Sequence, residues 1–145
     1  MNKGHVANLD RKIIAEVVDT PPELNPLQED VGNWGRGFVR VLDHGDMRAN
    51  YAVLLHEFVE KILCDFAGIT TEQADKEDAK YLKGKIRFNQ RSYWKYHCQA
   101  TKIERLFCKY MGLDWTEYEK LSDKTFLKAE AYFKKKRQES KSLKK

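Results

Sequence analysis

A long apolar segment, YAVLLHEFVEKILCDF at residues 51–66, is the feature that most constrains how this chain can fold. Its large apolar residues recur every three or four positions, which is the spacing of a helix with one buried face. That apolar stripe consists of Tyr51, Leu55, Phe58, Val59, Ile62, Leu63 and Phe66. We therefore predict an amphipathic helix from about Met47 to Ala67, which ends at Gly68 because a glycine commonly terminates a helix.

A second long helix is predicted over residues 91–111, RSYWKYHCQATKIERLFCKYM, and Gly112 follows it. Its predicted apolar stripe consists of Tyr96, Ala100, Ile103, Leu106, Phe107 and Tyr110. A shorter acidic helix, opened by an N-cap threonine, is expected within residues 69–82. Residues 114–123 begin another short helix in this interpretation.

The N-terminal part favours strands. RKIIAEVV at 11–18 is short and rich in β-branched residues, and FVRVL at 38–42 is bounded by glycines and turn residues. All three prolines lie in the segment 19–30, which predicts a loop. Together these elements predict an α+β fold, in which a small N-terminal β element packs on a mostly helical body. Residues 1–123 form the predicted domain, and 124–145 a tail that begins helical and becomes disordered.

The basic charge of the chain is concentrated in that tail. The net charge is +5, but residues 124–145 alone carry nine Lys or Arg residues against two Glu. The remaining residues are close to neutral, which argues against nucleic-acid binding by the folded domain and leaves weak contact through the tail. The N-terminus is polar, and no apolar run has the length of a membrane span, so a cytoplasmic location is expected.

Both long helices carry a His and Glu beside the predicted apolar stripe. His56 lies roughly 100° from the centre of its stripe and Glu60 roughly 140°, while His97 and Glu104 both lie about 100° from theirs. If the two helices pack antiparallel, these side chains meet at the rim of the core. A histidine and a glutamate four residues apart can share one ion. The pattern predicts a divalent-metal site with His56, Glu60 and either His97 or Glu104 as ligands.

The segment HEFVE resembles the HExxH helix of zincin metallohydrolases, in which the glutamate is the general base. Glu57 takes that place here, whereas Glu60 stands where the second zinc-binding histidine would be. Zinc is the first choice of metal, although the harder oxygen ligand favours it less than a histidine would and admits manganese or magnesium. The alternative interpretation is structural. His56 and Glu60 are then boundary residues of an ordinary amphipathic helix, Glu57 faces solvent, and Glu60 pairs with Lys61 or a neighbouring helix.

A second pattern of carboxylates competes with the first. Glu57 and Glu60 are followed by TEQAD, in which Glu72 and Asp75 have ExxD spacing. Paired carboxylates on adjacent helices hold magnesium in all-α nucleotide pyrophosphohydrolases of the MazG type, which this pattern partly resembles. His56 stands where that pattern has its leading glutamate. The structural alternative is that Glu72 and Asp75 stabilise a helix N-terminus.

Residues 51–121 also resemble a group of small phage and bacterial proteins that have an HExxE helix followed by a second His/Glu helix. The matching stretches are YAVLLHEFVEKILC, GIT, HCQATKIERLF and GLDWTEYE. The resemblance covers about half of the chain, implies a phage or prophage origin and hence the host cytoplasm, and brings no established activity. It draws attention to the same polar residues: His56, Glu57, Glu60, Asp75, His97 and Glu104.

Three functions follow as hypotheses. The first is a metal-dependent hydrolase with the metal held between two long helices and Glu57 as the catalytic base. The second is a magnesium-dependent nucleotide pyrophosphohydrolase. The third is a noncatalytic phage interaction protein that binds a host protein or nucleic acid. The sequence specifies neither the substrate nor the oligomeric state.

Overall fold

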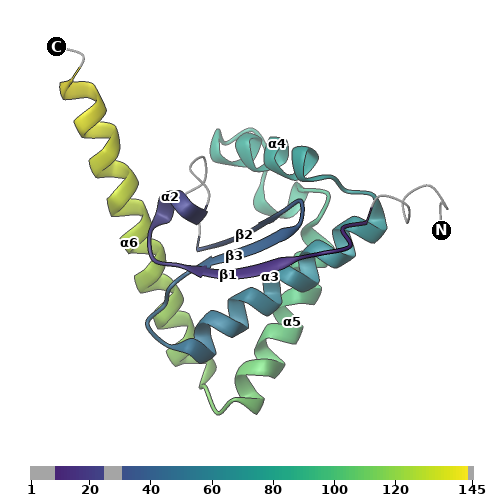
Figure 1. Ribbon diagram of the computed structural model, residues 1–145. Coiled ribbons are helices and arrows are strands. Elements are labelled where there is room, and N and C mark those ends of the chain that lie inside the picture. The colour runs from purple at the N-terminus through teal and green to yellow at the C-terminus, as the bar shows by residue number, and fades with distance from the viewer. Residues whose placement is uncertain (1–8, 25–30, 144–145) are drawn as a thin grey trace.

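The computed structural model describes residues 9–24 and 31–143, and Figure 1 shows the arrangement of their helices and strands. The elements in chain order are β1 (Ile14–Val18), α2 (Pro21–Leu24), β2 (Gly32–Gly35), β3 (Phe38–Leu42), α3 (Met47–Ala67), α4 (Thr71–Leu82), the 3-10 turn η1 (Phe88–Gln90), α5 (Trp94–Tyr110) and α6 (Trp115–Ser142). The predicted α+β class with N-terminal strands is confirmed. No helix in the described ranges is long and apolar enough to cross a membrane.

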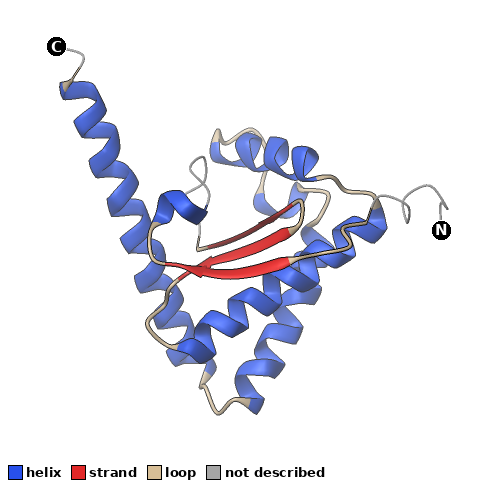
Figure 2. Cartoon of the chain, in the orientation of Figure 1, coloured by secondary structure: helices blue, strands red, loops and turns tan. Residues whose placement is uncertain are grey.

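The three strands form one sheet in the order β1-β3-β2, with β3 in the centre. β1 runs parallel to β3 with Val17 opposite Val41, and β2 runs antiparallel with Trp34 opposite Val39. Val39 and Val41 are fully buried because this face of the sheet packs on the helical layer. Figure 2 shows the sheet lying across α3, with α5 alongside that helix.

The sequence did not predict β2 or the short helix α2, because GNWG has low strand propensity and α2 lies in the proline-rich segment. Tertiary packing explains the strand. A side chain at Gly32 would place its Cβ 2.8 Å from Glu57 Oε1 and 3.0 Å from Val53 Cγ1. The glycine therefore lets β2 pass directly against α3, where strand pairing with β3 compensates for the weak propensity.

The two ends of α3 and the start of α4 agree with the predictions because capping is local chemistry. Asp46 precedes α3 and accepts a hydrogen bond from the Arg48 backbone N–H, and Thr70 caps α4 through the Gln73 N–H. Gly68 adopts a left-handed φ of 75° at the end of α3.

The predicted buried faces of the two long helices were wrong. In α3 the buried residues are Ala49, Asn50, Ala52, Val53, His56, Glu60, Lys61 and Cys64, and in α5 they are Ala100, Glu104 and Cys108. The large apolar residues Tyr51, Phe58 and Phe66 of the predicted stripe are exposed instead. The helices approach each other through small residues and through polar side chains that satisfy one another, so hydrophobicity alone gives the wrong rotation.

Helix α6 is longer than predicted. It begins after Asp114, whose carboxylate accepts hydrogen bonds from the Thr116 and Glu117 backbone N–H groups, and it continues for 28 residues to Ser142. The expected break near residues 123–124 is therefore absent from the described helix. Figure 1 shows its C-terminal part extending away from the body, and residues 134–143 are all exposed.

Candidate metal centre

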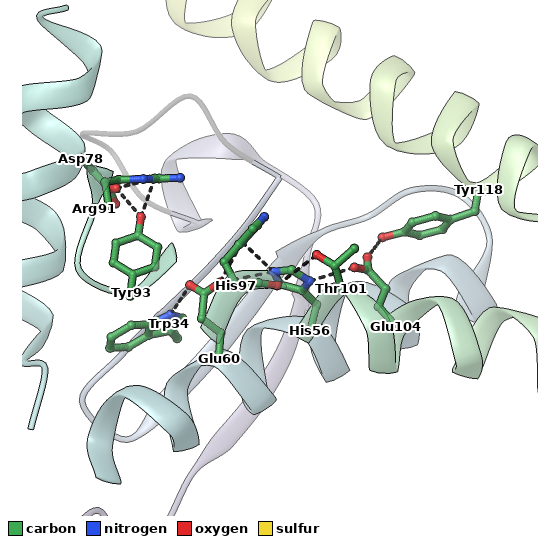
Figure 3. Close-up of polar contacts among 10 residues, drawn as sticks. All are labelled: Trp34, His56, Glu60, Asp78, Arg91, Tyr93, His97, Thr101, Glu104 and Tyr118. Atoms are coloured by element: carbon green, nitrogen blue, oxygen red, sulfur yellow. Dashed lines mark hydrogen bonds and ion pairs between the residues drawn. The ribbon is translucent and has the colours of Figure 1, made fainter. Parts of the chain in front are cut away.

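Three side chains from the two long helices converge at one point between α3 and α5. His56 and Glu60 lie one turn apart on α3, and His97 comes from α5 (Figure 3). His97 Nδ1 lies 3.1 Å from His56 Nε2 and 2.9 Å from Glu60 Oε2. His56 Nε2 and Glu60 Oε2 are 3.3 Å apart, which closes a triangle of three donor atoms. The three side chains form a His-Glu-His group within metal-binding distance.

The size of this triangle matches the ligand spacing around a divalent ion. Zinc–ligand distances of about 2.0–2.1 Å place tetrahedral ligand atoms about 3.3 Å apart. Octahedral ions with similar bond lengths place adjacent oxygen or nitrogen ligands about 3.0 Å apart. The observed separations of 2.9–3.3 Å span both values. One ion can therefore reach all three donor atoms with little movement of the helices.

Two of the three side chains are held from behind by further hydrogen bonds. Glu104 Oε2 lies 2.8 Å from His56 Nδ1, and the Tyr118 hydroxyl donates to the other Glu104 oxygen. Trp34 Nε1 donates to Glu60 Oε1 at 2.9 Å. A carboxylate on the far nitrogen of a ligand histidine fixes the ring so that the near nitrogen faces the ion. The residues present thus fit a metal site in both the donor atoms and the partners that orient them.

Burial and charge pairing set the protonation of the group when no metal is bound. Burial alone lowers the pKa of His56, but hydrogen bonds to Glu104 and Glu60 outweigh it and raise that pKa to about 11. Burial alone raises the pKa of Glu60, yet hydrogen bonds to His56 and His97 outweigh it and lower that pKa to about 2. Without metal the pair is therefore an imidazolium and a carboxylate at neutral pH.

Metal binding at pH 7 is consequently expected to release about one proton from His56, because the ion must displace the proton held there. Metal affinity should rise with pH above neutrality, since the competing proton leaves only as pH approaches the raised pKa. Calorimetric zinc titrations in buffers of different ionisation enthalpy measure the proton count. A binding heat that does not depend on the buffer would show that His56 is not protonated in the metal-free protein at pH 7.

A cavity of about 740 Å³ opens beside the three donor side chains. It is bounded by β2 and by helices α3, α4, α5 and α6, and it contains many aromatic side chains. The aromatic lining residues are Trp34, Tyr81, Phe88, Tyr93, Trp115, Tyr118 and Phe126. The cavity gives a small molecule or a peptide segment access to the triangle of donor atoms.

The structure separates the six polar residues singled out in the sequence. His56, Glu60 and His97 form the converging group, while Glu104 contacts His56 from behind instead of joining the triangle. Glu57 and Asp75 both line the cavity, the first from α3 and the second from α4, and neither belongs to the group of three within the described residues.

The two α3 members of the His-Glu-His group are more deeply buried than the sequence predicted. His56 and Glu60 are only 6% and 5% exposed, so they lie inside the helix interface rather than at its rim.

Two supporting residues, Trp34 and Tyr118, were missed. Trp34 reaches Glu60 across 26 positions of the chain, and Tyr118 reaches Glu104 across 14. Each is an aromatic residue with a hydrogen-bonding tip, a residue type that finds a polar partner when buried. That chemistry is the only signal the sequence offers, because no local spacing connects either residue to its partner.

We compared the chain with protein-family models, with curated proteins and with solved structures, and none of them matched.

Proposed function

We propose that this protein is a divalent-metal-dependent hydrolase in which His56, Glu60 and His97 hold the ion. The observation that carries the proposal is the triangle of donor atoms with 2.9–3.3 Å sides. Two imidazoles and one carboxylate are a ligand set used by catalytic zinc. Zinc is the first choice, and manganese is the second because the carboxylate and the shorter sides of the triangle also suit octahedral ions.

Three protein ligands leave a coordination position for a water molecule, whose pKa a catalytic zinc ion lowers to near neutrality. Glu57 lines the adjoining cavity and follows His56 directly in α3. We assign Glu57 the role of general base, since a carboxylate in that position can accept a proton from such a water. Glu104 and Trp34 hold the ligand side chains in place.

The charge of the cavity favours this hydrolase over a nucleotide pyrophosphohydrolase. Its lining contains six carboxylates, Glu57, Glu60, Asp75, Asp78, Glu104 and Glu130, against the guanidinium of Arg91. Arg91 is itself engaged, because it donates to Asp78 Oδ1 at 2.7 Å and its guanidinium lies over the Phe88 ring. In the absence of bound magnesium a cavity of this charge repels a polyphosphate, and it suits a neutral or positively charged substrate, such as a peptide amide.

Turnover by the zinc-loaded protein tests the proposal. Neutral and basic amino-acid p-nitroanilides and unstructured peptides should be cleaved, and nucleoside triphosphates should not. Glu57→Gln is expected to lower kcat by about 100-fold or more while zinc stoichiometry stays at one. Glu72→Gln is the matched control, because Glu72 is an exposed glutamate of α4 that does not line the cavity.

Magnesium-dependent nucleoside triphosphate hydrolysis that is lost in the Glu60→Gln variant and retained in Glu72→Gln would instead support the pyrophosphohydrolase. Absence of amide and peptide cleavage by the zinc-loaded protein, or unchanged cleavage in Glu57→Gln, would overturn the catalytic part of the proposal.

Glu104→Gln is expected to weaken zinc binding by about 10- to 100-fold, because the amide holds the His56 ring less firmly than the carboxylate. Competition with a chromogenic chelator measures the affinity. Gln99→Ala, an exposed change on the same helix, serves as the control and should bind zinc like the parent protein. Equal affinities in Glu104→Gln and the parent would contradict the role given to Glu104.

A further inference from the structure

The face of α3 that points away from the sheet is apolar from Tyr51 to Phe66. Tyr51, Leu55, Phe58, Ile62 and Phe66 follow one another at intervals of three or four residues, so they lie on one side of the helix. The sheet contacts the other side, where Val53 and Glu57 approach Gly32. Tyr51 and Phe66 are each 51% exposed. An apolar face of this length is unusual on a helix that contacts only water.

Helix α5 presents a similar face beside it. Tyr96, Ile103, Phe107 and Tyr110 share one side of α5, and Leu106 lies next to them. Tyr110 is 80% exposed, and Ile103 and Leu106 are exposed as well. The helices are antiparallel neighbours, since His56 meets Glu104 while Glu60 meets His97. Figure 1 shows the sheet on one side of this helix pair, and the helical spacing places both apolar faces on the opposite side.

The two faces together are large enough for a protein interface. The six most exposed members are Tyr51, Phe58, Phe66, Ile103, Leu106 and Tyr110. With side chains of about 150–250 Å² that are roughly half exposed, they present on the order of 600 Å² of apolar surface. A stable interface buries about 800 Å² on each partner. The partly exposed Leu55, Ile62 and Phe107 add to the same surface.

We propose that the α3–α5 apolar face joins two copies of this protein in a symmetric dimer. The face carries no charge that would select an oppositely charged partner, and its available area approaches what one half of a dimer buries. Lys95, Lys102 and Lys109 are exposed along the outer edge of α5, which gives the apolar centre the polar rim typical of interfaces. A twofold axis through this surface places the α3–α5 apolar face of one copy against the same face of the second copy.

The dimer leaves the cavity open, because none of the face residues lines it. Dimerisation is therefore independent of the proposed hydrolase activity, and substitutions on the face should not alter zinc stoichiometry. Loss of metal binding and loss of dimerisation are separate results.

Sedimentation velocity of the full chain from about 1 to 100 μM tests the proposal, with the parent protein expected to sediment as a dimer. Tyr110→Glu and Phe58→Glu should each raise the dimer dissociation constant about 100-fold or more, because each places a charge within the apolar face that the two copies bury. Leu127→Glu is the matched control, since Leu127 is 60% exposed on α6 outside the face. It should remain dimeric.

The Tyr110→Glu variant is expected to fold, because the Tyr110 side chain is 80% exposed and its replacement leaves the core intact. Circular dichroism of both variants checks the fold. A parent protein that sediments as a monomer at 100 μM would overturn the proposal. A dimer that persists in Tyr110→Glu and Phe58→Glu would overturn it too, since another surface would then hold the copies together.

Discussion

His97→Ala is expected to lower zinc affinity by at least about 1000-fold, because it removes one of three protein ligands and leaves only the His56–Glu60 pair on α3. His97 is the best ligand to remove. Its side chain is 29% exposed, whereas those of His56 and Glu60 are almost fully buried, so the fold should tolerate the change. Competition titration with a chromogenic chelator at pH 7.5 gives the affinities.

Two comparisons make this result specific. Gln99→Ala alters an exposed residue of the same helix and should retain the parent affinity. His97→Asp supplies an oxygen ligand from the same position and should bind zinc more tightly than His97→Ala. If His97→Ala binds zinc as tightly as the parent protein, α5 contributes no ligand and the proposed centre between the helices is wrong.

Lys61→Met is expected to reduce the free energy of unfolding by about 3 kcal/mol, because it leaves two partly buried carboxylates without their cation. Lys61 is only 1% exposed, and its ammonium group lies 2.7 Å from Asp10 and 2.9 Å from Asp65. Asp10 also accepts a hydrogen bond from the Gly37 backbone N–H, so the lysine connects α3 to the segment before β1 and to the β2–β3 turn.

Urea denaturation followed by circular dichroism measures this effect. Lys76→Met, which changes an exposed lysine of α4, should alter the free energy of unfolding by less than about 0.5 kcal/mol. A Lys61→Met protein as stable as the Lys76→Met control would mean that methionine packing compensates fully for the lost ion pairs.

The sequence predicts the capped ends of α3 and α4 well, and it predicts the end of α6 and the buried faces poorly. The difference has a physical basis. Asp46, Thr70 and Gly68 act on backbone groups within a few residues, so their effect can be recognised locally. The rotation of α3 depends on which neighbour it meets. Small residues such as Ala49 and Ala52 admit close approach of the sheet and α5, while the larger apolar side chains remain outside. Hydrophobic periodicity cannot distinguish a core face from a face that binds a second chain.

The candidate site was predictable only where its signal is local in the sequence. The i, i+4 spacing of His56 and Glu60 is a local signal, and a second His/Glu helix is a recognisable companion. The sequence did not indicate that Glu104 would contact His56 from behind while His97 would join the triangle, because that choice depends on the register between α3 and α5. Trp34 comes from a strand that the sequence did not predict.

Metal content of the untagged protein is the most direct test of the proposed centre. The protein should be purified without chelator, incubated with zinc or manganese, desalted and analysed by elemental mass spectrometry together with His97→Ala. We expect about one ion per chain in the parent protein and a large loss of bound metal in the variant. A parent protein that retains neither zinc nor manganese would contradict the account, and His56, Glu60 and His97 would then be a buried hydrogen-bonded network that joins two helices.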